Sequence, residues 1–238
     1  MAVFFFVVGL EIKREVLDGQ LSSPAKRRLP VVAAIAGMAV PALIYLGIAG
    51  TDYPGQRGWA IPAATDIDFA MGVIGLLGKR VPGSLRLFLL TVGIVDDLGA
   101  VAIIALFYTT SIKLSWLVAA LAVLAAMTTV GRRRTHSYTV TIGLALALWF
   151  CVLNSGVHPT IAGVAAAFTI PMTLGSAGDS MLLRMEHALV PWNGYIVVPL
   201  FGFANAGVAL AGIGLAGFID PVPLGIAAGL FFGKQIGI

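Results

Sequence analysis

The sequence has little charge and almost no cysteine. Charged residues make up 11% of its 238 residues, against roughly 25% in soluble globular domains. The one cysteine, Cys151, cannot form an intrachain disulfide. Hydrophobic residues reach 59%, and the mean hydropathy is +0.98. This composition excludes an ordinary soluble domain and predicts a membrane protein whose apolar runs of about 20 residues cross the bilayer as helices.

The spans are expected where apolar runs alternate with polar turns. They are Met1–Leu10, Leu29–Ala49, Trp59–Gly78, Ser84–Tyr108, Leu114–Val130, Tyr138–Leu153, Ile161–Ile170, Val190–Ile213 and a last run after Asp220. Pro171–Leu189 is expected to be the longest polar loop. The pattern predicts an all-α polytopic helical bundle of about nine spans, with residues 1–238 in a single transmembrane transporter domain. Because Met1 is followed at once by an apolar run with no polar lead-in, and the last residues stop in the middle of an apolar run, we expect a fragment truncated at both ends.

The net charge of +4 does not predict a nucleic-acid partner, because the basic residues fall in short clusters between apolar runs. Assigning alternate loops to opposite sides places twelve of the fifteen basic residues on one side, which is predicted to be cytoplasmic. They are Lys13, Arg14, Lys26, Arg27, Arg28, Lys79, Arg80, Arg86, Arg132, Arg133, Arg134 and Arg184. This agreement supports the span count, since one missed helix would scramble the distribution.

The third run, WAIPAATDIDFAMGVIGLLG, carries a proline near its start and two acids in its middle. Pro62 removes a backbone donor and clashes with the preceding turn, which predicts a broken helix at Ala63 to Asp66. Interrupted backbone at membrane depth is tolerated where it is buried in protein or lines a wet cavity. The carboxylate of Asp66 could offset the positive ends of backbone dipoles at this break.

Two adjacent acids, Asp96 and Asp97, lie within the apolar run TVGIVDDLGAVAIIALFY. Charged side chains at bilayer depth usually mark an ion or proton route. Neighbouring helical positions point about 100° apart, so the two roles should differ. One carboxylate could bind a small alkali cation while the other pairs with a buried cation, and Lys234 is the one basic residue of a predicted span that is not assigned to a loop. Carboxylate oxygens that bind the cation cannot also hold protons, so the cation and the proton would compete.

Other readings of these acids remain open. They could form interhelical hydrogen bonds without transport, or two of them could activate water in an intramembrane aspartyl protease. The glycine-x-glycine-aspartate pattern expected of such a protease is missing, because residues 93–96 read GIVD. The sequence shows no metal-ligand cluster, nucleophilic triad or phosphate loop, so we expect a protein that is not an enzyme and has no cofactor. A sodium-coupled solute symporter is a second transport alternative.

Several segments together resemble the NhaA family of bacterial sodium/proton antiporters. They are MAVFFFVVGLEIKRE, GWAIPAATDIDFA, IVDDLGA, SGVHPTIAG, RMEH, PLFGFANAGV and GLFFGKQIGI, in order along essentially the whole chain. The resemblance implies an inverted-repeat fold with broken helices. The family has about twelve spans, of which this chain resembles the second through the tenth. The span before them and the two after them, including the second broken helix, are then expected to be absent.

The resemblance also implies a function. A pH-regulated protein of the bacterial inner membrane would exchange cytoplasmic Na⁺ or Li⁺ for external H⁺ electrogenically. Membrane lipid is an expected partner, a homodimer is left open, and nucleic acid is not expected.

Site residues follow from the same resemblance. Asp97 and Asp96 would be the ion and proton carriers and the Na⁺ or Li⁺ ligands, with Lys234 as the partner of Asp96. Thr65 and Asp66 would lie at the unwound part of the broken helix. Asp68 departs from the family pattern and is an accessory candidate that could line the cavity, cap the break or tune ion choice.

A second set of residues matches family positions linked to the cytoplasmic funnel and the pH response. They are Glu11, Arg14, Glu15, Glu186, His187 and His158. From the spacing alone, Glu11, Arg14 and Glu15 share one helix face and could pair with one another. His158 has a second reading, as a helix-start residue before Pro159.

Overall fold

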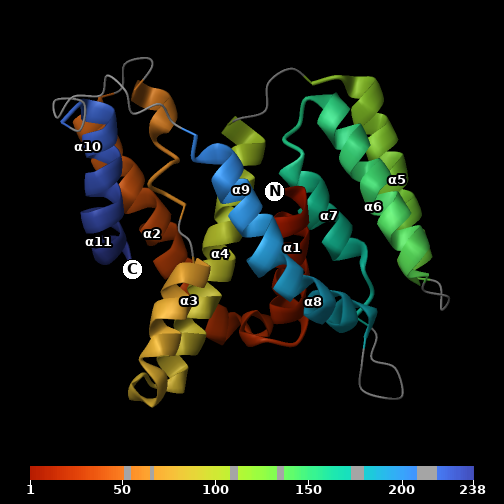
Figure 1. Ribbon diagram of the computed structural model, residues 1–238, viewed down its shortest axis with the longest axis horizontal. Coiled ribbons are helices and arrows are strands. Elements are labelled where there is room, and N and C mark those ends of the chain that lie inside the picture. The colour runs from red at the N-terminus through yellow and green to blue at the C-terminus, as the bar shows by residue number, and fades with distance from the viewer. Residues whose placement is uncertain (51–54, 65–66, 108–111, 133–136, 173–179, 208–218) are drawn as a thin grey trace. The chain divides into compact units, whose positions relative to one another are not determined.

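The structure, a computed structural model, describes residues 1–50, 55–64, 67–107, 112–132, 137–172, 180–207 and 219–238 (Figure 1). Every regular element in these ranges is helical, which confirms the all-α prediction. The α-helices are α1 (Ala2–Leu17), α2 (Pro24–Ala49), α3 (Ile67–Leu76), α4 (Gly83–Phe107), α5 (Leu114–Arg132), α6 (Tyr138–Ser155), α7 (Thr160–Thr169), α8 (Met181–Trp192), α9 (Val198–Asn205), α10 (Pro221–Ala228) and α11 (Lys234–Gly237).

Two π-helical turns join α-helices into longer rods. Asn193–Val197 connects α8 to α9, and Gly229–Gly233 connects α10 to α11. Pro191 lies just before the first π turn, where a proline without a backbone N–H leaves a carbonyl unpaired and favours an irregular turn.

Four helices among the described residues are long and apolar enough to cross a membrane. They are Arg27–Ala49 within α2, Gly83–Phe107, Leu114–Arg132 and Tyr138–Ser155. Each matches a predicted span, with ends that differ by a few residues. The total of about nine spans and the single transporter domain remain predictions.

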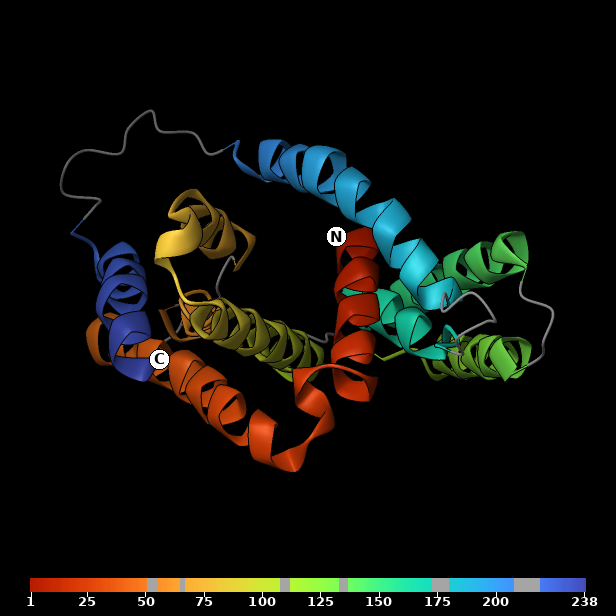
Figure 2. The ribbon, with the colours of Figure 1, turned by 90° about the horizontal axis from the view of Figure 1, so that it is seen from below.

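The chain divides into two compact units, and the first contains Met1–Gly19 and Ile104–Val208. In this unit α1 packs along α7 and contacts α8, while α5 packs along α6 (Figures 1 and 2). Small residues bring α1 and α7 close together: a Cβ added to Gly9 would lie 2.7 Å from the Cβ of Ala167. Close approach of this kind replaces the hydrophobic driving force that helices lack in lipid.

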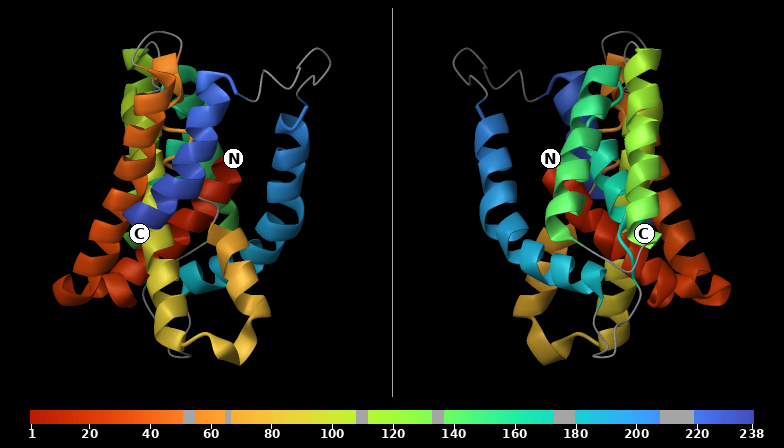
Figure 3. Two further views of the ribbon diagram at one scale, coloured as in Figure 1. Left: turned by 90° about the vertical axis from the view of Figure 1, so that its left-hand side faces the viewer. Right: turned by 90° about the vertical axis from the view of Figure 1, so that its right-hand side faces the viewer.

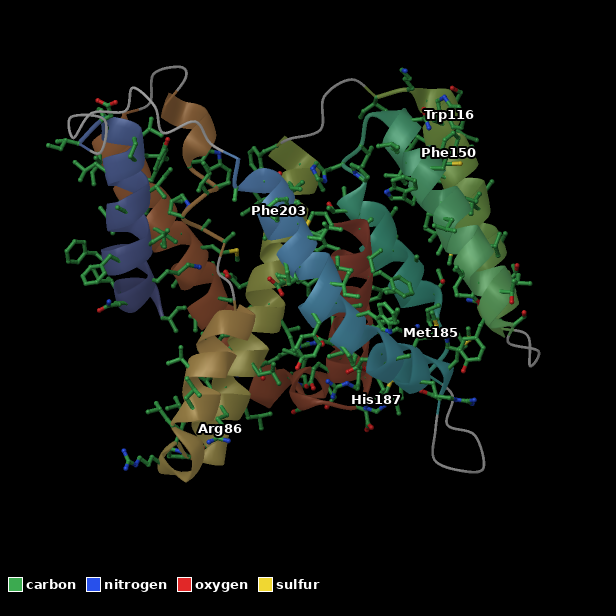
Figure 4. All side chains as sticks on the ribbon, in the orientation of Figure 1. Arg86, Trp116, Phe150, Met185, His187 and Phe203 are labelled. Carbon is green, nitrogen blue, oxygen red and sulfur yellow. The ribbon has the colours of Figure 1, made fainter. Side chains whose placement is uncertain are left out.

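An aromatic pair holds α5 against α6 in the same unit. The rings of Trp116 and Phe150 meet edge to face, with centroids 5.7 Å apart (Figure 4). Met127, Leu148 and Cys151, also from α5 and α6, belong to one buried apolar cluster.

The second unit contains Gln20–Ile103 and Ala209–Ile238, and within it α10 and α11 pack on α2. Ala33 and Ala34 of α2 form a buried cluster with Val92 of α4. The α10–α11 rod runs beside α2 (Figure 3). Its contact face is made of glycines spaced four residues apart, Gly225, Gly229, Gly233 and Gly237, each of whose added Cβ would touch α2. Helix α2 is therefore the common support of α4 and the α10–α11 rod.

The start of α4 is tied back to the turn that precedes it. Arg86 donates a hydrogen bond to the carbonyl of Gly78, and Gly78 has a φ of 55°, in the left-handed region that favours glycine. Figure 4 shows Arg86 near the beginning of α4. The interaction fixes the hairpin between α3 and α4.

The predicted loop Pro171–Leu189 is wrong in its second half, because α8 begins at Met181. The hydroxyl of Ser180 accepts a hydrogen bond from the backbone N–H of Leu183 at 3.2 Å, which caps the helix. Met181, Leu182 and Met185 are buried, whereas Arg184 and His187 are exposed. The segment is an amphipathic helix, and its polar face gave the sequence the composition of a loop.

The third predicted span is helical only in its second half among the described residues. Trp59–Ala63 form turns, and α3 begins at Ile67. Pro62 is fully buried within these turns, consistent with the predicted interruption. Thr65 and Asp66, at the predicted break itself, lie outside the described residues.

Candidate functional site

The second unit contains a buried ion pair between α4 and α11. The Nζ of Lys234 lies 3.4 Å from Oδ2 of Asp96 and donates a hydrogen bond of 2.6 Å to the carbonyl of Ala63. The side chain of Asp96 is 4% exposed and that of Lys234 is 12% exposed. The expected contact between these two residues is therefore present. An ammonium that reaches two acceptors at once joins α4, α11 and the turn before α3 through a single group.

The backbone of α4 holds Asp96 in a well-packed position. Thr91, Val92, Gly93 and Ile94 in the preceding turn are all buried. The hydroxyl of Thr91 donates to the carbonyl of Leu87 at 2.7 Å, so it is satisfied within its own helix. The residues that precede Asp96 are thus fixed by packing, and they hold its carboxylate in place.

Contacts with α2 fix the position of α4. A Cβ added to Gly99, three residues beyond Asp96, would collide with the terminal Sδ and Cε atoms of Met38. The small residue at this position lets α4 approach α2 closely. This contact and the Ala33–Ala34–Val92 cluster lie on either side of the carboxylate along the helix.

Asp97 differs from Asp96 in its surroundings. It is half-buried, whereas Asp96 is 3% exposed. Successive helical positions point about 100° apart, so the two carboxylates leave α4 in different directions, as the sequence predicts. Asp97 is the more accessible of the two and the better placed for exchange with a mobile ion. The side chain of Asp68, on α3, lies outside the described part of the structure.

The first unit contains a second charged cluster, where α1 meets α8. Arg14 donates from Nε to both carboxylate oxygens of Glu186 at 3.1 Å, and from a terminal nitrogen to Glu15 at 3.1 Å. Glu15 is 5% exposed and Glu186 is 7% exposed. The structure therefore brings together three of the residues predicted for the pH response, from segments more than 170 residues apart.

The remaining residues of that predicted set are placed differently. Glu11 is half-buried on α1, one helical turn before Glu15. His187 is exposed on α8 (Figure 4). His158 lies just before α7, where its Nδ1 is 2.8 Å from the hydroxyl of Thr160. This contact at a helix start agrees with the structural reading of His158.

Lys13 has a structural role that sequence reasoning missed. Its ammonium donates hydrogen bonds to the carbonyls of Phe168 and Ile170, the first at 2.7 Å. These carbonyls belong to the end of α7, where a helix leaves its last acceptors without partners and favours a positive charge. Lys13 lies beyond the apolar run of α1, and burial lowers the pKa of its ammonium. The sequence pattern predicts Lys13 only as a topology signal.

Comparison with known proteins places the chain in a family. The family model described as Na⁺/H⁺ antiporter 1 matches residues 1–238. The chain belongs to this antiporter family. Its relatives are transporters rather than enzymes, and family membership together with the four long apolar helices makes the chain a multi-pass membrane protein.

Individual members of the Na⁺/H⁺ antiporter 1 family are closely similar to the chain. Na⁺/H⁺ antiporter NhaA 1 of Erythrobacter litoralis is 62% identical over 238 residues, which cover all of this chain and 58% of the relative. NhaA 2 of Novosphingobium aromaticivorans is 60% identical over 238 residues, covering all of the chain and 60% of the relative. NhaA of Nitrobacter hamburgensis is 54% identical over 240 residues, covering all of the chain and 59% of the relative. The chain thus spans a little under two thirds of the length of these curated relatives.

Proposed function

We propose that the full-length protein is a secondary antiporter that exchanges cytoplasmic Na⁺ for external H⁺. The observation that carries the proposal is the buried contact of Asp96 with Lys234, next to the more accessible carboxylate of Asp97. Buried charges that persist at membrane depth mark ion and proton routes. The names of the family relatives, all Na⁺/H⁺ antiporters, support the same activity.

The exchange follows from competition for carboxylate oxygens. Hard oxygen ligands bind small alkali cations, and an oxygen that holds a proton no longer offers full negative charge to the ion. In the proposed cycle Asp97 binds Na⁺ from one side of the membrane. On the other side the ion leaves and protons take its place. Either cargo neutralises the Asp97 carboxylate before the site changes access, which lowers the cost of moving that carboxylate through an apolar environment.

Lys234 gives Asp96 a second way to be neutralised. In the observed geometry its ammonium compensates the carboxylate while also donating to the carbonyl of Ala63. When Asp96 takes up a proton, Lys234 retains the carbonyl acceptor and the pair separates. The alternation of Asp96 between an ammonium and a proton couples proton uptake to a change in contacts between α4 and α11.

The proposal includes properties that the family resemblance suggests. Li⁺ would substitute for Na⁺, and exchange would be electrogenic because two carboxylates and a lysine share the site. The protein would lie in a bacterial inner membrane, in contact with lipid and with a homodimer as a candidate assembly. The Arg14–Glu15–Glu186 cluster would contribute to pH regulation, since it is a buried network of titratable groups.

The decisive experiment changes the proposed ion ligand. In everted vesicles containing the full-length protein, added Na⁺ should dequench a pH-sensitive dye, and Asp97→Asn should abolish this response. The substitution keeps size and removes the charge that competes for ion and proton. Asp220→Asn is the matched control, because Asp220 is exposed at the start of α10 and should leave the response intact.

Two outcomes would count against the proposal. A normal Na⁺ response in Asp97→Asn vesicles would remove Asp97 from the ion site. Na⁺ uptake that depends on an added solute and moves no protons would favour a sodium-coupled symporter instead.

A further inference from the structure

The residue before Lys234, Gly233, packs directly against the backbone of α2. A Cβ added to Gly233 would lie 2.6 Å from Cα, 2.9 Å from the nitrogen and 3.0 Å from Cβ of Pro41. Two of these three atoms are backbone, and they belong to a proline within a buried part of α2. The neighbour therefore cannot swing aside as the end of a flexible side chain could.

The overlap at Gly233 is larger than the distance by which the Lys234–Asp96 pair can lengthen. Restoring an ordinary contact of 3.4 Å from the 2.6 Å approach requires a retreat of about 0.8 Å. The Lys234 Nζ to Asp96 Oδ2 distance is 3.4 Å, which leaves only about 0.6 Å before the conventional limit of roughly 4 Å for an ion pair. A retreat of this size exceeds that margin wherever it carries Lys234 away from Asp96.

A second glycine controls the other acceptor of Lys234. A Cβ added to Gly229, one turn earlier on the same face, would lie 2.8 Å from Cβ of Pro62 and 3.0 Å from the carbonyl oxygen of Pro41. Pro62 immediately precedes Ala63, whose carbonyl accepts the hydrogen bond from Lys234. The Gly229 contact thus places the acceptor, while the Gly233 contact places the donor.

We propose that Gly233, assisted by Gly229, is a positioning residue for the exchange site, which holds the Lys234 ammonium within reach of both Asp96 and the Ala63 carbonyl. The inference rests on the antiport function proposed above and adds to it a steric determinant outside the charged residues. Gly233 acts through Lys234 and touches no ion. Its role is to set the distance between α11 and α2 at the point where the lysine leaves the helix.

The test compares Gly233→Ala with Gly72→Ala in the full-length protein. Gly72 lies on α3, and an added Cβ there meets nothing within 4 Å, so this control should behave as wild type. Gly233→Ala should lower the rate of Na⁺-dependent proton movement about tenfold or more, since a misplacement of roughly 1 Å can cost about a hundredfold. It should also move the pH of half-maximal rate by about half a unit or more, because the contact that governs protonation has changed.

A stability measurement separates positioning from simple packing. Lys234→Met should lower the melting temperature of the wild-type protein, and at most half of that drop should remain in the Gly233→Ala background, where the pair is already open. Gly229→Ala, whose nearest neighbour is a side-chain atom, is a milder variant for the same measurement if Gly233→Ala does not fold. An unchanged pH profile with fully additive losses in stability would overturn the proposal.

The proposed function can fail separately. Absence of any Na⁺-dependent proton movement in wild-type vesicles would reject antiport, while the additivity of the two stability losses would still decide whether Gly233 positions Lys234.

Discussion

Arg14 is the side chain whose loss should most disturb the first unit. Its guanidinium pairs with two buried carboxylates, those of Glu15 and Glu186, at 3.1 Å each. Arg14→Met keeps the length of the apolar stem and removes the guanidinium. Both carboxylates would then remain in a site where they are at most 9% exposed, without the donor that compensates them here. Glu186→Gln instead leaves Arg14 with Glu15 as its partner.

Arg14→Met and Glu186→Gln should lower stability by different amounts. Breaking a buried ion pair from one side costs about 3–5 kcal/mol. The Arg14 side chain is 33% exposed, so solvent screening reduces this figure to about 2–3 kcal/mol. Glu186→Gln should cost about 1 kcal/mol, because the amide can still accept a hydrogen bond. At roughly 2–4 °C per kcal/mol, Arg14→Met should lower the melting temperature by about 5–10 °C.

Thermal unfolding of the purified full-length protein in detergent measures these shifts. The double variant Arg14→Met/Glu186→Gln should be less destabilised than the two single losses predict, because it removes one of the carboxylates left behind. Arg132→Met provides a matched control, since Arg132 is exposed at the end of α5, and should change the melting temperature little. If Arg14→Met proves no more harmful than Glu186→Gln, the assignment of Arg14 as the shared cation is wrong.

Two further substitutions test the second unit. Lys234→Met should lower stability by about 3–5 kcal/mol, because it leaves the Asp96 carboxylate buried without its ammonium. Adding Asp96→Asn should restore part of this loss in the same thermal assay. A double variant whose loss equals the sum of the two single losses would contradict the pairing. Tyr45→Phe should cost about 1–3 kcal/mol, because the fully buried hydroxyl of Tyr45 donates to the buried Gly55 carbonyl at 2.6 Å. The control Tyr195→Phe, at an 85% exposed position, should have no measurable effect; equal shifts in the two tyrosine variants would argue against the hydrogen bond.

The helices with uniform apolar faces could be predicted closely from the sequence. The predicted spans Leu114–Val130 and Tyr138–Leu153 correspond to Leu114–Arg132 and Tyr138–Ser155 in the structure. Their composition is decisive because the bilayer requires about 20 apolar residues per crossing and leaves few alternatives. Only the ends differ, where a helix continues for a turn into polar residues.

Elements whose stability depends on tertiary contacts could not be predicted. Helix α8 buries Met181, Leu182 and Met185 against residues of α1 and α7, so its formation depends on a partner surface that hydropathy does not reveal. The pairing of Arg14 illustrates the same limit. Helical spacing predicted neighbours on α1, whereas the bidentate partner, Glu186, comes from α8.

The candidate site was predictable in its charged residues and not in its neutral ones. Carboxylates and a lysine stand out in apolar runs, so Asp96, Asp97 and Lys234 could be selected, and the family resemblance paired two of them. The carbonyl of Ala63 and the absence of a side chain at Gly233 carry no signal in composition. They matter through contacts that only the folded chain defines: the Ala63 carbonyl lies 2.6 Å from Nζ of Lys234, and a Cβ added to Gly233 would lie 2.6 Å from Cα of Pro41.

The π turn at Gly229–Gly233 has a geometrical consequence for the face that carries the glycines. In a pure α-helix, at about 100° per residue, the twelve steps from Gly225 to Gly237 would rotate the contact face by about 120° away from α2. One π turn absorbs one residue, so the rotation falls to about 20°. All four glycines therefore point the same way, as their contacts with α2 show. The wide turn straightens a four-residue repeat that a regular helix would wind out of alignment, and it sets the angle at which Lys234 leaves the rod.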